Sequence, residues 1–149
     1  MQVESGCTPW VADWNKDGRK DLLLGSGSGA LMLSINEGSD SQPVFAPLRQ
    51  VGTGDTALRP DGPSAPCVFD WNQDGQMDVL TGTGNGHIHV YYTAGGEKEP
   101  VLSADELIQL NGQALMLEGA TSPFPVDWNQ DGQTDLLIGM RGGGVYCVQ

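Results

Sequence analysis

The chain has 149 residues, of which only 17% are charged, and it contains 22 glycines and nine prolines. Glycine weakens a helix interior and proline breaks it, so this composition favours many short strands joined by tight turns. The net charge of −12, from 19 acidic and seven basic residues, argues against nucleic-acid binding, which needs a basic surface. No apolar run approaches the ~18 residues that span a bilayer. No basic-then-apolar start resembles a signal peptide, so we expect a cytosolic chain or a mature form whose export signal has been removed.

The first predicted elements occupy residues 1–50. A short apolar segment (CTPWVADW) runs into the loop string DWNKDGRKD, which begins at Asp13. An apolar run, a glycine-rich turn and a second apolar run follow in residues 21–36, and a fourth segment opens at Pro43 with PVFAPLRQV. Runs of apolar and β-forming residues separated by glycine turns predict antiparallel strands joined by hairpins, with glycine supplying positive φ. Residues 1–50 are therefore predicted to form four strands.

The same order of elements occurs three times. The loop string returns at Asp70 and at Asp127, in each case after 57 residues, and a second Pro-Val pair stands at Pro100, 57 residues after the first. A fixed period of this length is typical of repeat folds, and four-stranded antiparallel units are typical of propeller blades. We therefore predict an all-β fold of about 2.6 β-propeller blades per chain. The first blade is residues 1–50, the second is 64–110, and the third, 121–149, is incomplete because it has no outer strand.

The segment LSADELIQL, residues 102–110, combines helical propensity with a position equivalent to FAPLRQV in the first repeat. We predict an outer strand from this alignment. The strings GSGSG and GTGNG lie between two predicted strands and have neither a following helix nor a Gly-Lys-Ser/Thr sequence, so they are predicted to be hairpin turns and not phosphate-binding loops.

The repeated loop carries the chemistry. Each copy reads D-x-N-x-D-G-x-x-D and so offers oxygen ligands at positions 1, 3, 5 and 9, a backbone carbonyl at position 7, and glycine at 6 for a sharp turn. An EF-hand needs glutamate at position 12, where this chain has Leu24, Thr81 or Ile138, so an EF-hand is excluded. The candidate ligands are Asp13, Asn15, Asp17, Arg19 and Asp21; Asp70, Asn72, Asp74, Gln76 and Asp78; and Asp127, Asn129, Asp131, Gln133 and Asp135.

The alternative is that these residues only form turns, because Asp and Asn are common turn formers. A turn needs such residues at one or two places, whereas each loop has them at four, and three crowded carboxylates repel without a cation. We therefore favour one Ca²⁺ per loop, up to three per chain. Nine of the 19 acids lie in the loops, and three Ca²⁺ would halve the net charge of −12.

The string and its period resemble the FG-GAP repeats of integrin α-subunit propellers and the related VCBS repeats of bacterial secreted and surface proteins. This resemblance implies Ca²⁺ between the first two strands of each blade, held by positions 1, 3, 5 and 9. Literal Phe-Gly and Gly-Ala-Pro sequences are absent, so the VCBS-type repeats are the closer match. Fungal integrin-like propeller lectins have similar blade lengths and bind sugars between blades, but no residue of this chain maps onto a lectin pocket.

Propellers have typically four to eight blades, so this chain is not expected to close a ring alone. Either it assembles with copies of itself or it is a piece of something longer. A dimer would give six blades and is favoured, and an open sheet edge could also accept a strand or build a filament.

The remaining aromatic and titratable residues are assigned structural roles. The tryptophan in each loop is predicted to pack between blades rather than to stack on a sugar. His87 and His89 are predicted to be exposed strand residues and not a metal site, because no third ligand is evident. Cys7, Cys67 and Cys147 share no repeat position, so we expect mostly buried free thiols, with one disulfide possible.

Three functions follow from these features. The first is a non-enzymatic, calcium-binding propeller for adhesion or for recognition of carbohydrate or protein, extracellular or at the cell surface. The second is a structural block that self-assembles into a ring or filament. The third is an enzyme acting, for example, on polysaccharide; Asp105 with Glu106, or Glu97 with Glu99, are unconvincing acid/base pairs, and no catalytic constellation is evident. We therefore expect that the chain is not an enzyme.

Overall fold

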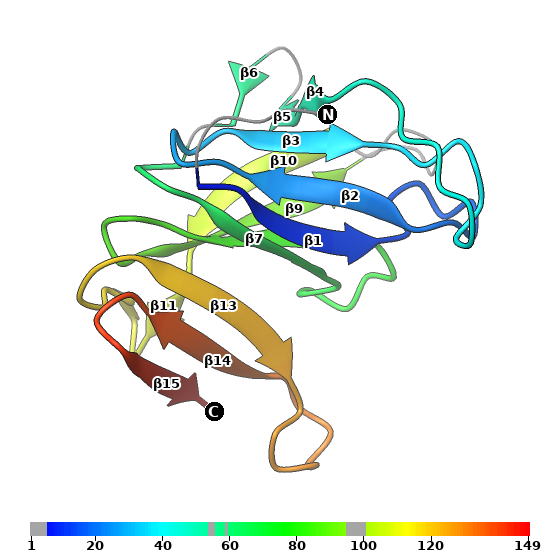
Figure 1. The fold of residues 1–149 in the computed structure, drawn as a ribbon. Coiled ribbons are helices and arrows are strands. Elements are labelled where there is room, and N and C mark those ends of the chain that lie inside the picture. The colour runs from blue at the N-terminus through cyan, green and yellow to red at the C-terminus, as the bar shows by residue number, and fades with distance from the viewer. Residues whose placement is uncertain (1–5, 54–55, 59, 95–100) are drawn as a thin grey trace.

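The fold consists of antiparallel sheets stacked one after another along the chain (Figure 1). The computed structural model describes residues 6–53, 56–58, 60–94 and 101–149. The first sheet has the order β1-β2-β3-β4, with strands Thr8–Ala12, Asp21–Gly25, Leu31–Ser34 and Arg49–Gln50. The second has β7 (Ala65–Phe69), β8 (Asp78–Gly82), β9 (Ile88–Ala94) and β10 (Val101–Leu107) in the same order. The third has β13 (Thr121–Val126), β14 (Asp135–Met140) and β15 (Gly144–Val148).

Two small hairpins lie between the large sheets. They are β5–β6, Gly52–Thr53 with Thr56–Ala57, and β11–β12, Gln109–Leu110 with Gln113–Ala114. The described part of the chain contains strands and no helix, so it holds no helix that could cross a membrane. The predicted all-β fold of repeated blade-like sheets is confirmed.

The three sheets have the same internal register. Leu23 of β2 lies opposite Leu33 of β3, and the equivalent pair in the second sheet is Leu80 with Val90. In the third sheet the equivalent pair joins residues 137 and 147. Successive strand residues point to opposite faces, so every sheet presents one face forward along the chain and one backward. We call the face that carries Leu23 and its equivalents the leading face, and the opposite one the trailing face.

The core lies between neighbouring sheets. In the first cluster, Leu23 and Leu33 from the leading face of the first sheet pack with Val79 and Tyr91 from the trailing face of the second, and all four are at most 2% exposed. The second cluster repeats this arrangement between the second and third sheets, and includes Leu80 and Leu136. Burial of each such side chain contributes roughly 1.5–3 kcal/mol, so these layers hold the blades together.

Glycines allow the sheets to approach closely. A Cβ added to Gly82, the last residue of β8, would lie 2.1 Å from the Thr121 carbonyl oxygen of the third sheet. The equivalent contact for Gly25 is 2.3 Å, to the Ser64 carbonyl oxygen. Sequence reasoning assigned these glycines to hairpin turns, but here the close approach of two backbones, and not a positive φ, requires them. The turn glycine Gly86 does have positive φ, +93°.

The fourth strand of the first sheet differs from the prediction. A continuous strand was expected from Pro43, but the structure has one isolated bridge, from Asn36 to Phe45, and then the two-residue β4. Pro43 and Pro47 cannot donate to a strand ladder, and Asn36 Oδ1 instead accepts the amide of Val44 at 3.0 Å. In the second sheet an outer strand forms over Val101–Leu107, with a register shift between Leu102 and Asp105, but residues 109 and 110 of the predicted strand belong to β11.

Two side-chain predictions were wrong. Cys7 and Cys147 are exposed, and Cys67 alone is buried; all three are free thiols, so no disulfide forms. The His89 side chain is 14% exposed, and its Nδ1 lies 2.7 Å from Asp105 Oδ1 on β10, the strand that pairs with β9. His87 is half-buried, with Nδ1 3.0 Å from the Leu115 carbonyl oxygen.

Candidate metal centre

Each repeated loop joins the first and second strands of its sheet, and in Figure 1 the three loops lie at corresponding ends of the sheets. Their backbones agree closely. Position 4 has φ of 55° at Lys16, 58° at Gln73 and 60° at Gln130, and the glycine at position 6 has φ of 84–86° in all three. A non-glycine residue with positive φ is uncommon and costs energy, so the repeated loop geometry is strongly specified by its side chains.

The first aspartate of each loop organises the turn. Asp13 accepts the amide of Asp17 on Oδ1 at 3.0 Å and that of Gly18 on Oδ2 at 2.9 Å. Asn15 Oδ1 accepts the same Asp17 amide at 3.2 Å. Two oxygens that share one N–H must lie close together, so positions 1 and 3 converge. Asp70 and Asp127 make the same contacts in their loops.

The aspartate at position 5 completes this inner group. Its Oδ1 accepts the amide of position 7 in every loop, at 2.8–2.9 Å. Its Oδ2 accepts the side-chain amide of the asparagine at position 3, at 2.8 Å in the first loop and 3.0 Å in the second. The residues at positions 1, 3 and 5 are thus brought together in each loop, and they are half-buried or exposed.

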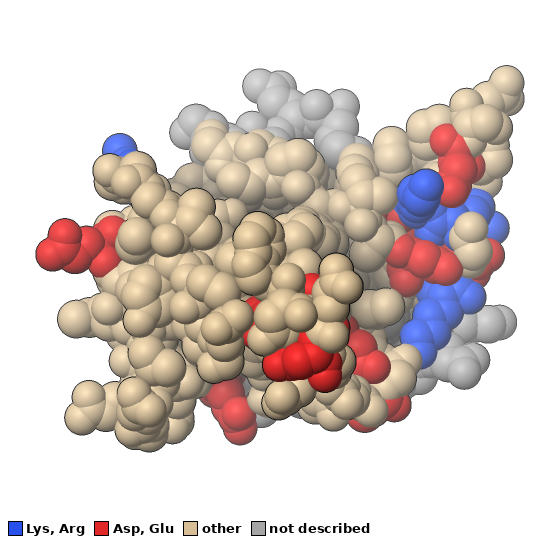
Figure 2. Space-filling model, turned by 90° about the horizontal axis from the view of Figure 1, so that it is seen from below, with Lys and Arg blue, Asp and Glu red and all other residues tan. Residues whose placement is uncertain are grey.

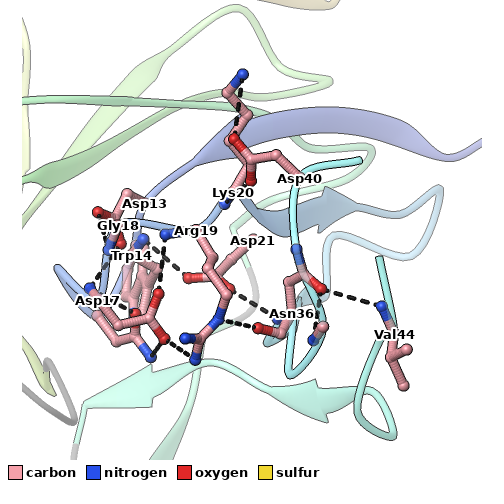
Figure 3. Close-up of polar contacts among 12 residues, drawn as sticks. Asp13, Trp14, Asp17, Gly18, Arg19, Lys20, Asp21, Asn36, Asp40 and Val44 are labelled. Carbon is pink, nitrogen blue, oxygen red and sulfur yellow. Dashed lines mark hydrogen bonds and ion pairs between the residues drawn. The ribbon is translucent and has the colours of Figure 1, made fainter. Parts of the chain in front are cut away.

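The aspartate at position 9 has a different setting. Asp21 is 1% exposed; its Oδ2 accepts the Trp14 amide at 3.0 Å and its Oδ1 the Asn36 amide at 2.8 Å (Figure 3). Asp78 makes the equivalent bonds to the amides of Trp71, at 3.0 Å, and Thr93, at 2.9 Å. Both oxygens are therefore committed to backbone amides, and this carboxylate ties the loop to the end of the third strand.

Burial raises the pKa of Asp21 and of Asp78 above the usual value, and the bonds from backbone amides only partly oppose this effect. Sequence reasoning did not identify the partner residues Asn36 and Thr93. A signal was present, because these two positions are 57 residues apart, with Asn36 just after β3 and Thr93 in the last part of β9.

The first loop contains a positively charged side chain, Arg19, at position 7. The Arg19 guanidinium contacts Asp17 Oδ2 at 2.5 Å, and its Nε donates to the Asn36 carbonyl oxygen at 2.8 Å (Figure 3). Glutamine occupies this position in the other two loops. Lys16 also reaches the second loop, where its Nζ donates to the Gly75 carbonyl oxygen at 2.7 Å. Figure 2 accordingly shows basic side chains among the acids at the right-hand end of the molecule, where the β1–β2 loop lies in Figure 1.

The donor set has the chemistry that a hard cation requires. Within the described residues, no group of three or more His, Cys, Asp or Glu side chains is arranged to hold a metal ion. Each loop nevertheless gathers two carboxylates and one amide oxygen at positions 1, 3 and 5. A carboxylate has about four lone-pair sites, so oxygens that accept one amide each retain capacity for an ion. Oxygen donors without sulfur or imidazole suit Ca²⁺ or Mg²⁺ and not Zn²⁺.

A cavity lies on the leading face of the second sheet. It has a volume of about 350 Å³ and is lined by residues that include Trp71, Tyr92, Glu106 and Gln109. The equivalent cavity on the first sheet is only about 110 Å³, and Val101 of the second sheet is among its lining residues. The two cavities occupy the same place in successive repeats, and the larger one combines aromatic and polar groups.

Sheets of antiparallel strands with one loop geometry at a 57-residue period define a repeat protein of the β-propeller class. The chain belongs to the FG-GAP-like repeat family, which matches residues 13–81 and 70–138. The chain is 27% identical over 141 residues to human integrin alpha-7 and 26% identical over 155 residues to integrin alpha-3 of Cricetulus griseus. It is also 27% identical over 152 residues to the phosphatidylinositol-glycan-specific phospholipase D of Mus musculus.

These matches cover 87%, 93% and 87% of the chain, respectively. The chain spans only 11%, 14% and 18% of the length of those relatives. The matches therefore identify the repeat unit, and the relatives' functions as whole proteins do not transfer to the chain.

Proposed function

We propose that the chain is a non-enzymatic, calcium-binding propeller module for adhesion or for recognition of a carbohydrate or protein ligand. It works outside the cell or at its surface, and it completes its ring by association with copies of itself. The observation that carries the calcium proposal is the threefold repetition of one loop geometry, in which oxygens at positions 1, 3 and 5 converge. The family match to integrin alpha subunits supports the adhesion or recognition role.

The ion has a structural role in this proposal. The residues that would hold it are Asp13, Asn15 and Asp17 and their equivalents, together with the carbonyl at position 7. The position 9 aspartate holds the loop in place through its hydrogen bonds to backbone amides. Bound Ca²⁺ supplies positive charge that offsets the repulsion between the loop carboxylates. Because amide hydrogen bonds already shape the loop, the ion stabilises a preformed turn. Extracellular calcium is millimolar, which is enough to fill sites of modest affinity.

Thermal unfolding with calcium, magnesium or a chelator tests the calcium proposal. An ion at ten times its dissociation constant adds about 1.4 kcal/mol per site. For a chain of this length, that raises Tm by roughly 3–6 °C for each filled site. The variant Asp70→Asn is expected to lose the increase in Tm that calcium binding at the second loop provides. Glu118→Gln, at an exposed acid outside the loops, should behave as wild type. Equal Tm values in calcium and in chelator would refute the proposal.

The cavity on the second sheet is the candidate recognition site. Trp71 packs against the core between the second and third sheets, as predicted, while Tyr92 offers aromatic surface for stacking on a sugar ring. Glu106, which accepts the Tyr92 hydroxyl at 3.1 Å, offers acceptor oxygens for sugar hydroxyls. A glycan and peptide array tests this half of the proposal, with Glu106→Gln as the site variant and Glu118→Gln as its control. Silence of the wild type across a broad array would count against recognition and leave the calcium result standing.

The second candidate is a structural block that self-assembles into a ring or filament. The observation in its favour is the exposed apolar surface of the third sheet, where Val145 is 71% exposed and Trp128 is 64% exposed. One relative is named as a phospholipase, but the match spans 18% of its length, so we do not extend that activity to this chain.

A further inference from the structure

The two sheet–sheet interfaces within the chain are built from the same repeat positions. On the leading face of the first sheet, Trp14 is 3% exposed and Leu31 is completely buried against the second sheet. On the leading face of the second sheet, Ile88, the equivalent of Leu31, is completely buried against the third. The receiving trailing face is also repeated: Val79 in the second sheet and Leu136 in the third are 0% and 2% exposed.

The leading face of the third sheet has the same apolar pattern but no covering sheet among the described residues. Val145, the equivalent of Leu31 and Ile88, is 71% exposed. Trp128, the equivalent of Trp14, is 64% exposed. Phe124, on the first strand of this sheet, packs edge-to-face on Trp10 of the first sheet and is still 50% exposed. Large exposed apolar side chains on one side of a sheet are characteristic of an interaction site.

The trailing face of the first sheet is the matching open surface. Val11 on β1 is 52% exposed, whereas Val68, its equivalent in the second sheet, is 7% exposed. Phe45 is 37% exposed, whereas its equivalent, Leu102, is 1% exposed. The chain thus displays both halves of an interface that it already forms twice internally.

Gly139 provides independent support for a sheet-like occupant. Gly25 and Gly82 are required because a backbone carbonyl of the next sheet would lie 2.3 or 2.1 Å from an added Cβ. At Gly139, the equivalent residue of the third sheet, the nearest atom would be 3.8 Å away, within the same sheet. Gly139 therefore leaves the same space for a neighbouring backbone, and no described residue of another sheet fills it.

We infer that the leading face of the third sheet docks onto the trailing face of the first sheet of a second copy, as each blade docks onto the next within the chain. This inference rests on the proposed self-association and goes further by naming the two faces and the head-to-tail order. A head-to-tail contact uses two different surfaces, so it closes into a ring or propagates as an open chain. An isologous contact, by comparison, would use the same surface of both copies.

Sedimentation velocity and light scattering of the 149-residue chain in calcium test the inference, with one carboxylate placed on each face. Val145→Glu blocks the leading face and Val11→Glu blocks the trailing face, and each is expected to weaken association by about a hundredfold or more, because docking would bury an unpaired charge. An equal mixture of the two variants is expected to form a 1:1 complex that grows no further, since each supplies the face that the other has lost. Met116→Glu, at a residue 69% exposed and outside both faces, is the control and should associate as wild type.

The outcomes separate this inference from the proposed function. Association of the wild type that neither variant weakens would overturn the named faces and leave self-association standing. Association that Val145→Glu abolishes and Val11→Glu leaves intact would indicate a symmetric contact and overturn the head-to-tail order. A wild type that stays monomeric at the highest concentration would overturn both the inference and self-association, but not the calcium and recognition proposals, which are measured separately. Circular dichroism melting of each variant establishes that it is folded.

Discussion

The close contact at Gly82 predicts that one added methyl group destabilises the fold. A Cβ at this position would lie 2.1 Å from the Thr121 carbonyl oxygen, whereas ordinary contacts lie at 3.4–4 Å. The two backbones would therefore have to separate by about 1.3 Å in a close-packed interface. Thr121 cannot move freely, because it pairs with Met140 in the sheet and its Oγ1 accepts the Thr83 amide at 3.1 Å.

The expected cost of Gly82→Ala is about 3 kcal/mol, at the upper end of the usual range for overpacking. For a chain of this length that corresponds to a decrease in Tm of roughly 6–12 °C. The assay is urea unfolding followed by circular dichroism, with calcium fixed and at a protein concentration where the chain is monomeric.

Gly139→Ala is the matched control, because it makes the same change at the same repeat position. Its nearest new contact would be 3.8 Å, so no steric cost is expected. Replacing a strand glycine by alanine reduces the entropy of the unfolded chain, so the monomer should gain about 0.5–1 kcal/mol. The reasoning is refuted if Gly82→Ala unfolds within about 0.5 kcal/mol of wild type, or if Gly139→Ala loses as much stability as Gly82→Ala.

Three further predictions concern the loops and the buried thiol. Arg19→Gln removes a guanidinium from Asp17 and should strengthen calcium binding at the first loop about two- to fivefold, measured by calorimetry, with Lys20→Gln as the control. In chelator, the free energy of unfolding contributed by Asp21 and Asp78 is complete below their unfolded-state pKa, near 3.9. It decreases as pH rises through their higher folded-state pKa values, which urea unfolding at a series of pH values would measure. Burial raises the pKa of Cys67 to about 12, so an alkylating reagent at pH 8 should label two of the three cysteines in the folded chain.

Each of these predictions has a contradicting result. Unchanged calcium affinity in Arg19→Gln would mean that the guanidinium does not compete with the ion. Stability in chelator that increases steadily from pH 4 to 7 would contradict the stated sign for the two buried carboxylates. Rapid labelling of all three thiols without unfolding would contradict the burial of Cys67.

The sequence was sufficient for the parts of the fold that repeat. The 57-residue spacing placed the loops and the order of the strands, because the same local chemistry recurs at every copy. Prediction from the spacing failed where one copy of the repeat departs from the others. Pro47 and the side chain of Asn36 interrupt the first outer strand, and this depends on contacts across a turn that the period does not encode.

The candidate site was only partly predictable for a related reason. Position 9 of the loop was grouped with the other oxygen donors, yet burial of Asp21 behind the loop depends on how the third strand ends. Likewise, the roles of Gly82 and His89 are set by a neighbouring strand or sheet, and no local pattern specifies them. Tertiary packing therefore decided the features that sequence periodicity left open.

Native mass spectrometry of the wild-type chain in calcium measures both the number of bound ions and the number of chains in one spectrum. We expect up to three Ca²⁺ per chain, with the first loop filling last because of Arg19, in species that contain more than one chain. Chelator should remove the ions without unfolding the sheets. A spectrum of single chains with no bound calcium at millimolar concentration would contradict both calcium binding and self-association.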